Sequence, residues 1–463
     1  MTFNMTILVI FDAILATAAL CLTAVVRLGY PEFSSKLADF NTLFTAVIFV
    51  VLVLFSSHLM EVYDLGKNIK RREIIVNILF GTVTSFSLLS VVYYLNPKVM
   101  LGLGILILAL CCFALFQYCW HALYLMGKNT SRFCQKVLVL GTGALAAEIG
   151  SIVASNKRNF KLVGYSSCHA GTHASGMDGD AYEVPCDQIL GNCDNLRDIA
   201  RQAQAGIIVV ALSERRGVFP LRDVLTCKLN GIEIMDAPSF YETALSKLML
   251  ESITPGWFIF SDGFHRTTIL SALKRGIDIA LSCIGLLITL PFFPLIAVAI
   301  KLDSPGPVFF KQERTGNWEK RFMLIKFRTM RQDAEKGTGA VWAEKNDPRV
   351  TKLGRFFRGS RVDEIPQLIN VLLGSMSFIG PRPERPEFVE KLKAVIPYYS
   401  QRHFIKPGLT GWAQVRYSYG SSVDDAVEKL RYDLYYIKNM SPFLDTLIFF
   451  ETIKVVLFGF GGR

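Results

Sequence analysis

Four apolar stretches near the start of the sequence constrain its fold most strongly, at about 5–26, 40–60, 74–95 and 99–126. Each has roughly the 20 residues that a helix needs to cross the hydrocarbon core of a membrane. Because 51% of the chain is hydrophobic and only 19% is charged, the composition also favours several membrane segments. We therefore predict a multidomain membrane protein whose residues 1–130 form a four-helix transmembrane bundle.

Positive charges beside these stretches predict their orientation. Basic residues gather after the second and the fourth stretch, whereas the other two connections are poor in net positive charge. They are Lys67, Lys70, Arg71 and Arg72, then Lys128, Arg132 and Lys136. Cytoplasmic loops carry such an excess of Lys and Arg, so both ends of the bundle should lie in the cytoplasm. Asp12 and His58 are either functional intramembrane groups or interfacial contacts near helix ends, and we expect the second.

Residues 131–250 have a different pattern, which predicts a Rossmann-like α/β module. Residues 136–140 form a short apolar run, and Gly141-Thr-Gly143-Ala-Leu-Ala146 reads as a glycine turn that begins a helix. Further apolar strands are expected at 162–165, 206–211 and 232–235, with helical segments between them. Strands that alternate with helices predict a parallel sheet.

The glycine turn has the form of a dinucleotide site but lacks one expected partner. A G-x-G-x-x-A turn can hold a pyrophosphate at a helix N-terminus. The second strand, however, runs into Ser166, Ser167 and Cys168, where an acidic ribose ligand would be expected. A membrane-anchored oxidoreductase or sensor that uses NAD at this turn is therefore kept only as an alternative function.

A linker over 251–268 leads to the last unit, 269–463, which is strongly basic. This unit holds 29 Lys and Arg against 19 Asp and Glu, whereas residues 1–268 hold 21 against 20. Such an excess points to anionic partners, such as phosphates or acidic lipid headgroups. Nucleic acid is a poor fit, because the context is a membrane and no recognition motif is present.

The last unit begins with an apolar run, 280–300, that is interrupted by Pro291 and Pro294. Both prolines remove backbone donors in mid-run, and Lys274, Arg275 and Lys301 carry positive charge on both flanks. We therefore predict a re-entrant membrane helix at about 276–302, which breaks at the two prolines and returns to the cytoplasmic face. The apolar segment 442–458 is expected to be a membrane-associated helix, with a buried core helix as the close alternative.

Two adjacent acids, Asp363 and Glu364, are the feature most informative about chemistry. Pro366 follows them, and proline is favoured in the first turn of a helix, whose positive end attracts carboxylates and phosphates. Adjacent carboxylates suit a divalent metal such as Mg²⁺, and a carboxylate can also attack phosphorus to form an acyl phosphate. Taken alone, however, the two acids are better explained as helix caps.

Arginines near the acids favour phosphate binding. Arg358 and Arg361 precede the acids, and Arg382 lies in the sequence Gly380-Pro-Arg-Pro. Guanidinium groups are planar donors that match phosphate oxygens. Prolines on both sides of Arg382 stiffen its loop, which lowers the cost of ordering the side chain. A structural carboxylate is the alternative partner for Arg382.

Six blocks of the last unit follow one another in a recognisable order: 301–314, 326–330, 346–349, 363–367, 380–383 and 406–412. Together they resemble the bacterial sugar-transferase domain, which is the monotopic phosphoglycosyl transferase family. The resemblance covers about 270–463. The preceding bundle and α/β module are similar to the large members of that family, which prime exopolysaccharide or O-antigen assembly. Residues 417–420 and 429–436 look closest to the exopolysaccharide-type branch.

The resemblance implies a two-step reaction. Asp363 would attack the β-phosphate of a UDP-sugar and release UMP, and polyprenyl (undecaprenyl) phosphate would then displace the phosphosugar. Mg²⁺ is the implied cofactor, at Asp363 and Glu364, and Glu364 would help to position the metal or the acceptor phosphate. The implied phosphate- or substrate-binding residues are Arg358, Arg382, Arg361, Lys326 and Arg328.

The resemblance also implies a location. The protein would lie in the bacterial inner (cytoplasmic) membrane, in contact with lipid, with a monotopic α/β catalytic domain on the cytoplasmic face. It leaves a homodimer open. A non-catalytic scaffold for polysaccharide export is a third class of function, and the paired acids among arginines argue against it.

Overall fold

The computed structural model describes residues 3–30, 40–63, 71–127, 134–156, 159–168, 183–212, 219–264, 267–331, 347–417, 420 and 422–458. The basic residues Lys67, Lys70, Lys128 and Arg132, on which the predicted orientation rests in part, lie outside these ranges. The chain divides into two compact units, Met1–Phe240 and Tyr241–Arg463.

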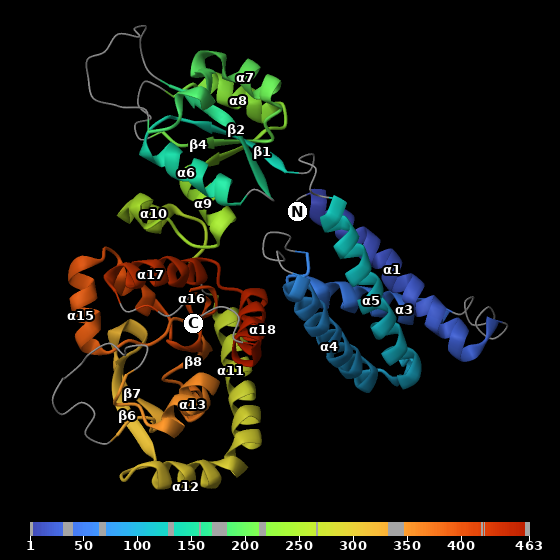
Figure 1. The fold of residues 1–463 in the computed structure, drawn as a ribbon, viewed down its shortest axis with the longest axis vertical. Coiled ribbons are helices and arrows are strands. Elements are labelled where there is room, and N and C mark those ends of the chain that lie inside the picture. Colours follow the sequence, from blue (N-terminus) through green and yellow to red (C-terminus); the bar gives the residue numbers. More distant parts are fainter. Residues whose placement is uncertain are drawn as a thin grey trace. The chain divides into compact units, whose positions relative to one another are not determined.

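The first unit begins with long apolar helices that pack against one another around a common core (Figure 1). They are α1 (Phe3–Leu28), α3 (Phe40–Leu59), α4 (Arg71–Leu95) and α5 (Leu103–Gly127), with a short 3₁₀ turn, η1 (Pro97–Val99), before α5. Several serine and threonine hydroxyls inside these helices, such as that of Ser85, donate to the carbonyl one turn back, which satisfies these donors within the helix itself.

The outward faces of these helices remain apolar: Val47, Leu79 and Leu115 are each more than half exposed. A helix that is apolar on all sides is typical of a membrane segment. Five helices of the described residues are long and apolar enough to cross a membrane. They are Thr6–Leu28, Asn41–Leu59, Arg72–Leu95, Leu103–Tyr124 and, in the second unit, Thr268–Asp303. The prediction of several apolar membrane helices and an α/β domain is confirmed.

Asp12, which lies in the middle of α1, is fully buried inside the helical bundle. Our expectation that it makes a contact at the membrane interface was therefore wrong. Its Oδ2 atom accepts a hydrogen bond from Gln117 Nε2 at 2.5 Å and lies 3.2 Å from His121 Nε2. The Gln117 amide also donates to Ser57 Oγ at 3.2 Å. A polar network inside an otherwise apolar core holds these helices in one register, because an unpaired polar group there costs free energy.

A five-stranded parallel sheet follows in the first unit. Its order is β3-β2-β1-β4-β5. The strands are β1 (Gln135–Leu140), β2 (Phe160–Ser167), β3 (Ile189–Asn192), β4 (Ile207–Val210) and β5 (Glu233–Asp236); the helices are α6 (Ala144–Ser155), α7 (Leu196–Ala203), α8 (Leu221–Leu229) and α9 (Ala237–Leu245), with 3₁₀ turns η2 (Cys186–Gln188) and η3 (Cys193–Asn195). The predicted strands at 136–140, 162–165, 206–211 and 232–235 are confirmed as β1, β2, β4 and β5.

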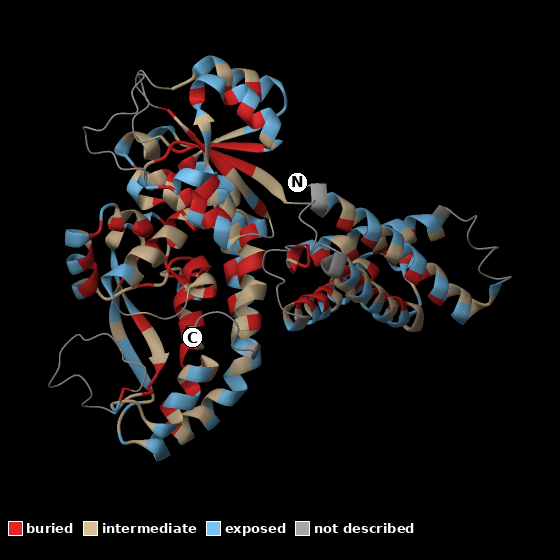
Figure 2. Ribbon diagram, turned by 45° about the horizontal axis from the view of Figure 1, so that its top comes forward, coloured by how far each residue is buried: buried red, intermediate tan, exposed pale blue. Residues whose placement is uncertain are grey.

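Helices cover both faces of this sheet, so its central strands are buried (red in Figure 2). The glycine turn after β1 is explained by this packing. Gly141 has a φ of +127°, and a Cβ atom there would lie 2.4 Å from the carbonyl oxygen of Ala211. Ser166, at the end of β2, is fully buried and donates to the carbonyl of Gly191. The fold thus requires a glycine at 141 whether or not a nucleotide binds.

The second unit is built around one large apolar core and two small sheets. Its elements before the acids are η4 (Leu250–Ser252), α10 (Pro255–Phe260), α11 (Thr268–Thr289), η5 (Leu290–Phe292), α12 (Phe293–Asp303), β6 (Phe309–Thr315), η6 (Asn317–Glu319), β7 (Arg321–Phe327) and α13 (Lys352–Ser360). Those that follow are η7 (Val362–Glu364), α14 (Gln367–Leu373), β8 (Ser377–Ile379), α15 (Pro386–Val395), η8 (Tyr399–Phe404), β9 (Gly408–Thr410), α16 (Trp412–Arg416), α17 (Val423–Lys438) and α18 (Pro442–Phe458). Strands β6 and β7 form an antiparallel hairpin, and β8 pairs with β9 in parallel.

One segment packs differently from our expectation. The segment 251–268, expected to be a linker, contains α10, and its Ile253, Trp257 and Phe264 join the core of the second unit. In α18, Leu447 and Ile448 are buried in the same core, whereas Phe443 and Val456 are 42% and 40% exposed. One face of segment 442–458 is therefore part of the core, and its other side presents apolar side chains.

The apolar run of the second unit bends sharply, so that α12 runs across the end of α11 (Figure 1). The bend lies at η5, which contains Pro291, and Pro294 is the second residue of α12. Each proline lacks the amide hydrogen that a continuous helix needs. Exposed side chains around the bend are apolar, including Leu287 at 77% and Leu295 at 68%. The first half of α11 instead docks on the unit through polar contacts, since Asp278 accepts from Ser377 and from the Phe378 amide.

Candidate active site

The two adjacent acids lie in a short turn between two helices. Thr351 caps the start of α13, and α13 ends at Arg361, which has a φ of +55°. This left-handed residue reverses the chain into η7, which contains Asp363 and Glu364; α14 begins at Gln367, directly after Pro366. Both acids are buried, at 7% and 8% exposure. Burial of two neighbouring carboxylates requires compensating positive charge.

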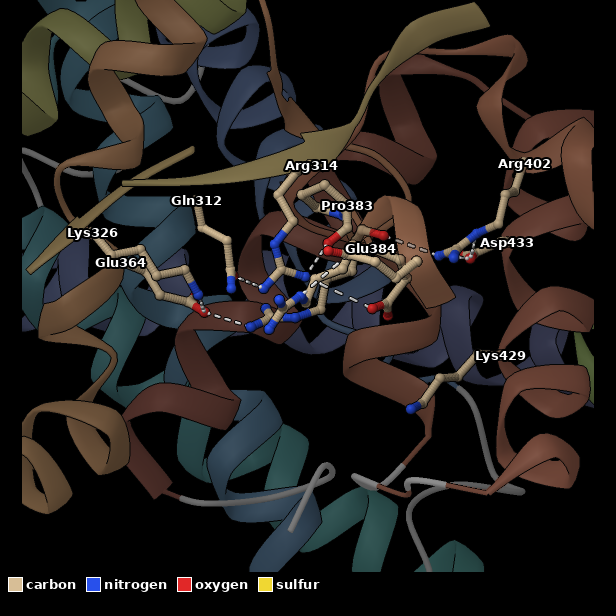
Figure 3. A network of polar contacts seen from close by, with 12 residues as sticks. Gln312, Arg314, Lys326, Glu364, Pro383, Glu384, Arg402, Lys429 and Asp433 are labelled. Carbon is tan, nitrogen blue, oxygen red and sulfur yellow. Dashed lines mark hydrogen bonds and ion pairs between the residues drawn. The ribbon is translucent and has the colours of Figure 1, made fainter. Parts of the chain in front are cut away.

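Glu364 receives that charge from three cationic side chains, of which Lys326 is labelled beside it in Figure 3. Arg382 Nη2 donates to its Oε1 at 2.8 Å, and Lys326 Nζ lies 3.6 Å from the same atom. Arg361 Nη1 is 4.0 Å from Oε2. Burial alone would raise the pKa of Glu364, but these cations outweigh it and lower the pKa to about 2. Glu364 is therefore ionised, and its charge is neutralised within the protein.

Asp363 has a different environment. No described residue forms a hydrogen bond or an ion pair with its carboxylate. Burial raises the pKa of Asp363 above its ordinary value; Lys326 opposes this effect, and the negative charge of Glu364 adds to it. A carboxylate with a raised pKa and no internal partner is a better base and nucleophile than an ordinary surface aspartate.

Lys326 acts on both acids, because its positive charge lowers the pKa of Asp363 and of Glu364. It lies on β7, and its side chain is mostly buried beside Glu364. Burial lowers its pKa to about 8; Arg382 contributes to this lowering, while Glu364 opposes it. Lys326 is thus mostly charged at pH 7, and it loses its proton as the pH rises through about 8.

Arg358 and Arg382 are placed so that substrate could reach them. The Arg358 Nε atom donates to Thr329 Oγ1 at 3.0 Å, and the charge of Arg358 acts on Asp363. The Arg382 side chain is 40% exposed although it contacts the buried Glu364. A guanidinium that is held on one edge and open on another can still donate to a phosphate.

Arg328 is the one predicted substrate-binding residue that the structure does not bring to this cluster. Its guanidinium donates to the carbonyls of Pro305 at 2.9 Å and Ser304 at 2.6 Å, and more weakly to that of Ile300 at 3.4 Å. The side chain is only 6% exposed. Arg328 therefore caps the C-terminal end of α12, and these contacts correct its predicted role in phosphate binding.

Other charged residues around the Arg382 loop were not predicted. Arg402, Asp433 and Arg314 form polar contacts beside the loop (Figure 3). A signal for Asp433 was present, because it shares the buried face of α17 with Leu430 and Ile437, three and four residues away. A carboxylate on an apolar helix face needs a buried partner.

The available oxygen ligands allow a test of the implied Mg²⁺. No group of three or more His, Cys, Asp or Glu side chains among the described residues could hold a metal. Glu364 is occupied by cations, which leaves Asp363 as the carboxylate with available oxygens. Magnesium is often bound by one or two carboxylates together with substrate phosphates. The residues therefore fit a Mg²⁺ that arrives with the substrate, rather than one held in a cage of protein ligands.

Comparison with known proteins matches the region of the chain that contains Asp363 and Glu364. Residues 269–459 match the family described as bacterial sugar transferase. An Aeromonas hydrophila protein named UDP-N-acetylgalactosamine-undecaprenyl-phosphate N-acetylgalactosaminephosphotransferase is 47% identical over 52% of this chain and 56% of its own length. A Komagataeibacter xylinus undecaprenyl-phosphate glucose phosphotransferase is 34% identical over 71% of this chain and 60% of its own length.

A third relative extends the match over most of both sequences. The Escherichia coli (strain K12) protein named UDP-glucose:undecaprenyl-phosphate glucose-1-phosphate transferase is 34% identical over 72% of this chain and 73% of its own length. The chain spans less than two thirds of the other two relatives. Because this relative matches over more than two thirds of both sequences, and Asp363, Glu364 and Arg382 all lie inside the region that the family model matches, the chain belongs to the bacterial sugar transferase family.

Proposed function

We propose that the chain transfers a sugar-1-phosphate from a UDP-sugar to undecaprenyl phosphate, releases UMP, and so primes exopolysaccharide or O-antigen biosynthesis. The contrast between the two acids carries this proposal. Glu364 is neutralised by Arg382, Lys326 and Arg361, whereas Asp363 is buried without a partner among the described residues. The names of the relatives agree with these substrate classes but differ in the sugar, so the sugar stays open.

In the first step, one carboxylate oxygen of Asp363 attacks the β-phosphorus of the UDP-sugar. The bond between this phosphorus and the bridging oxygen breaks, and the oxygen leaves with UMP. The product is an acyl phosphate that links Asp363 to the sugar-1-phosphate. Arg358 and Arg382 donate to the phosphate oxygens whose negative charge grows in the transition state. Glu364 keeps the Arg382 guanidinium oriented.

In the second step, a phosphate oxygen of undecaprenyl phosphate attacks the same phosphorus. The bond between phosphorus and Asp363 breaks, which restores the carboxylate and leaves a polyprenyl diphosphate sugar. Bound Mg²⁺ would neutralise phosphate charge at this site. Burial of Asp363 protects the acyl phosphate from water.

The membrane geometry is part of the proposal. Helices α1, α3, α4 and α5 would span a bacterial inner membrane, and α11–α12 would enter it and return. The exposed apolar surface around Pro291 and Pro294 supports insertion, and a bent helix keeps the acids on the side of cytosolic UDP-sugars. The parallel sheet would serve as a Rossmann-like module for assembly or regulation, because buried Ser166 offers no carboxylate to a ribose.

A labelling experiment tests the bend. Single cysteines at Leu270, in the first turn of α11, and at Phe310, on β6 after α12, should react with an impermeant maleimide from the same side of inverted vesicles. The native cysteines would be replaced first. The control is a cysteine at Met100, between α4 and α5, which should react from the opposite side because an odd number of spans separates it. Opposite labelling of Leu270 and Phe310 would mean that α11–α12 crosses the membrane.

The reaction itself is tested by measuring UMP release. The full chain in detergent is supplied with a panel of UDP-hexoses and UDP-N-acetylhexosamines, with and without undecaprenyl phosphate. We expect a single stoichiometric burst of UMP without acceptor and steady turnover with it, both lost on chelation and restored by Mg²⁺. Absence of UMP release from every donor would refute the proposed function.

The titration of Lys326 and Asp363 predicts a bell-shaped pH dependence of the UMP burst. As the pH falls, Asp363 takes up a proton at a pKa above the ordinary aspartate value, and the nucleophile is lost. As the pH rises through about 8, Lys326 loses its charge, and the phosphate loses a nearby cation. Lys326→Arg stays charged and should move the alkaline limb well above pH 9. An unchanged alkaline limb in this variant would assign that limb to another group.

A further inference from the structure

The loop that carries Arg382 is held by its carbonyl groups. Four successive carbonyls accept hydrogen bonds from outside the loop: Pro381 from the Gly408 amide at 2.8 Å, Arg382 from Arg402 Nη2 at 3.0 Å, Pro383 from Arg314 Nη1 at 3.1 Å, and Glu384 from the Thr315 amide at 2.9 Å. Prolines at 381 and 383 have no amide hydrogen, so the loop cannot form a regular hydrogen-bond ladder of its own. Its position depends on these external donors.

Arg402 is itself fixed by a buried set of partners (Figure 3). Its Nε and Nη2 atoms donate to Asp433 Oδ2 at 3.1 Å and 2.8 Å, and its Nη1 donates to the Tyr399 hydroxyl at 2.6 Å. Arg402 is 5% exposed and Asp433 is 2% exposed. The same Nη2 atom therefore connects α17, through Asp433, to the main chain of residue 382.

This connection leads directly to the acids. The Arg382 side chain donates to Glu364, so a shift of its main chain would move the guanidinium away from Glu364 and from a bound phosphate. A buried ion pair in itself adds little stability compared with a well-packed apolar pair. An apolar pair, however, could not donate to the Arg382 carbonyl. The contact with that carbonyl is thus the feature that distinguishes Arg402 and Asp433 from replaceable core residues.

We propose that Arg402 and Asp433 are positioning residues, which fix the main chain of Arg382 so that its guanidinium meets the transferred phosphate. The inference rests on the proposed function for its catalytic consequence but not for the geometry of the loop. Arg314 supports the loop from the hairpin side through Pro383. A displacement of about 1 Å in a positioned group can lower a rate about 100-fold.

The first test measures the loop without any substrate. Amide hydrogen exchange of the peptide 380–388 is compared in the full chain and in Arg402→Lys and Asp433→Asn. Lysine lacks the planar fork that reaches both Asp433 and the Arg382 carbonyl. Exchange in this peptide should become at least about tenfold faster in both variants, whereas Glu242→Gln should leave it unchanged. Glu242 pairs with Lys438 in the same unit, away from the loop. Unchanged exchange in both loop variants would overturn the inference.

The second test is a double-mutant cycle on UMP release. Arg402→Lys should lower kcat/KM about 100-fold in the wild-type chain but less than about threefold in an Arg382→Gln background, because its effect passes through Arg382. Equal losses in both backgrounds would show that Arg402 does not act through Arg382. A wild-type chain that releases no UMP would refute the proposed function instead, and the exchange experiment would still decide the role of Arg402.

Discussion

Asp363→Asn should abolish turnover, with a fall in UMP release of at least about 1,000-fold, or about 4 kcal/mol in activation free energy. An amide cannot form the acyl phosphate, so both the burst and the steady state should be lost. The protein should remain folded. Asp363 is buried without a partner among the described residues, and replacing a buried charge by a neutral group of the same shape removes a desolvation cost.

Thermal unfolding in detergent separates the two effects. We expect the Tm of Asp363→Asn to equal or exceed that of the wild type. Asp424→Asn, an exposed acid in the first turn of α17, is the matched control and should retain full activity. If Asp363→Asn released UMP at a near-normal rate, Asp363 would not be the nucleophile, and the mechanism would have to be rebuilt around another group.

Much of the fold could be predicted because it depends on local patterns. Long apolar runs specify membrane helices, and four of the five parallel strands are visible as short apolar runs beside turns. Strand β3 was missed, since its four residues include Gly191 and Asn192, which are poor strand formers, and it is recognised only by its pairing with β2. The pattern of segment 442–458 could not decide between a membrane-associated helix and a core helix, because an apolar helix looks the same whether lipid or a core covers it.

The candidate site could be predicted where a single motif contains its residues and not where contacts are long-range. The motifs indicated Asp363, Glu364 and Arg382, and the structure brings these three residues into one cluster. Arg402, which holds the Arg382 carbonyl, lies 20 residues further along the chain and has no motif of its own. Arg328 was misassigned for a related reason. A sequence shows that an arginine is present, but not that three backbone carbonyls already accept from it.

The roles of the two acids should separate most clearly in Glu364→Gln. Glu364 has a pKa of about 2, so this change removes a full negative charge at every working pH. Arg382 then loses an ionic partner, and phosphate positioning should suffer by about 100- to 1,000-fold in UMP release, the range found when one preorganised donor is lost from a catalytic site. Arg382 and its loop remain in place, because the loop is held through its carbonyls.

Glu364→Gln should still form the covalent intermediate, only slowly. Incubated with radiolabelled UDP-sugar and no acceptor, it should accumulate label on Asp363, whereas Asp363→Asn should never do so. The alkaline limb should also move below that of the wild type, since Glu364 raises the pKa of Lys326 and its loss lets that pKa fall. Failure of Glu364→Gln to label after long incubation, in a folded protein, would make Glu364 a participant in the attack. A shift of the alkaline limb in the opposite direction would contradict the electrostatic coupling between Glu364 and Lys326.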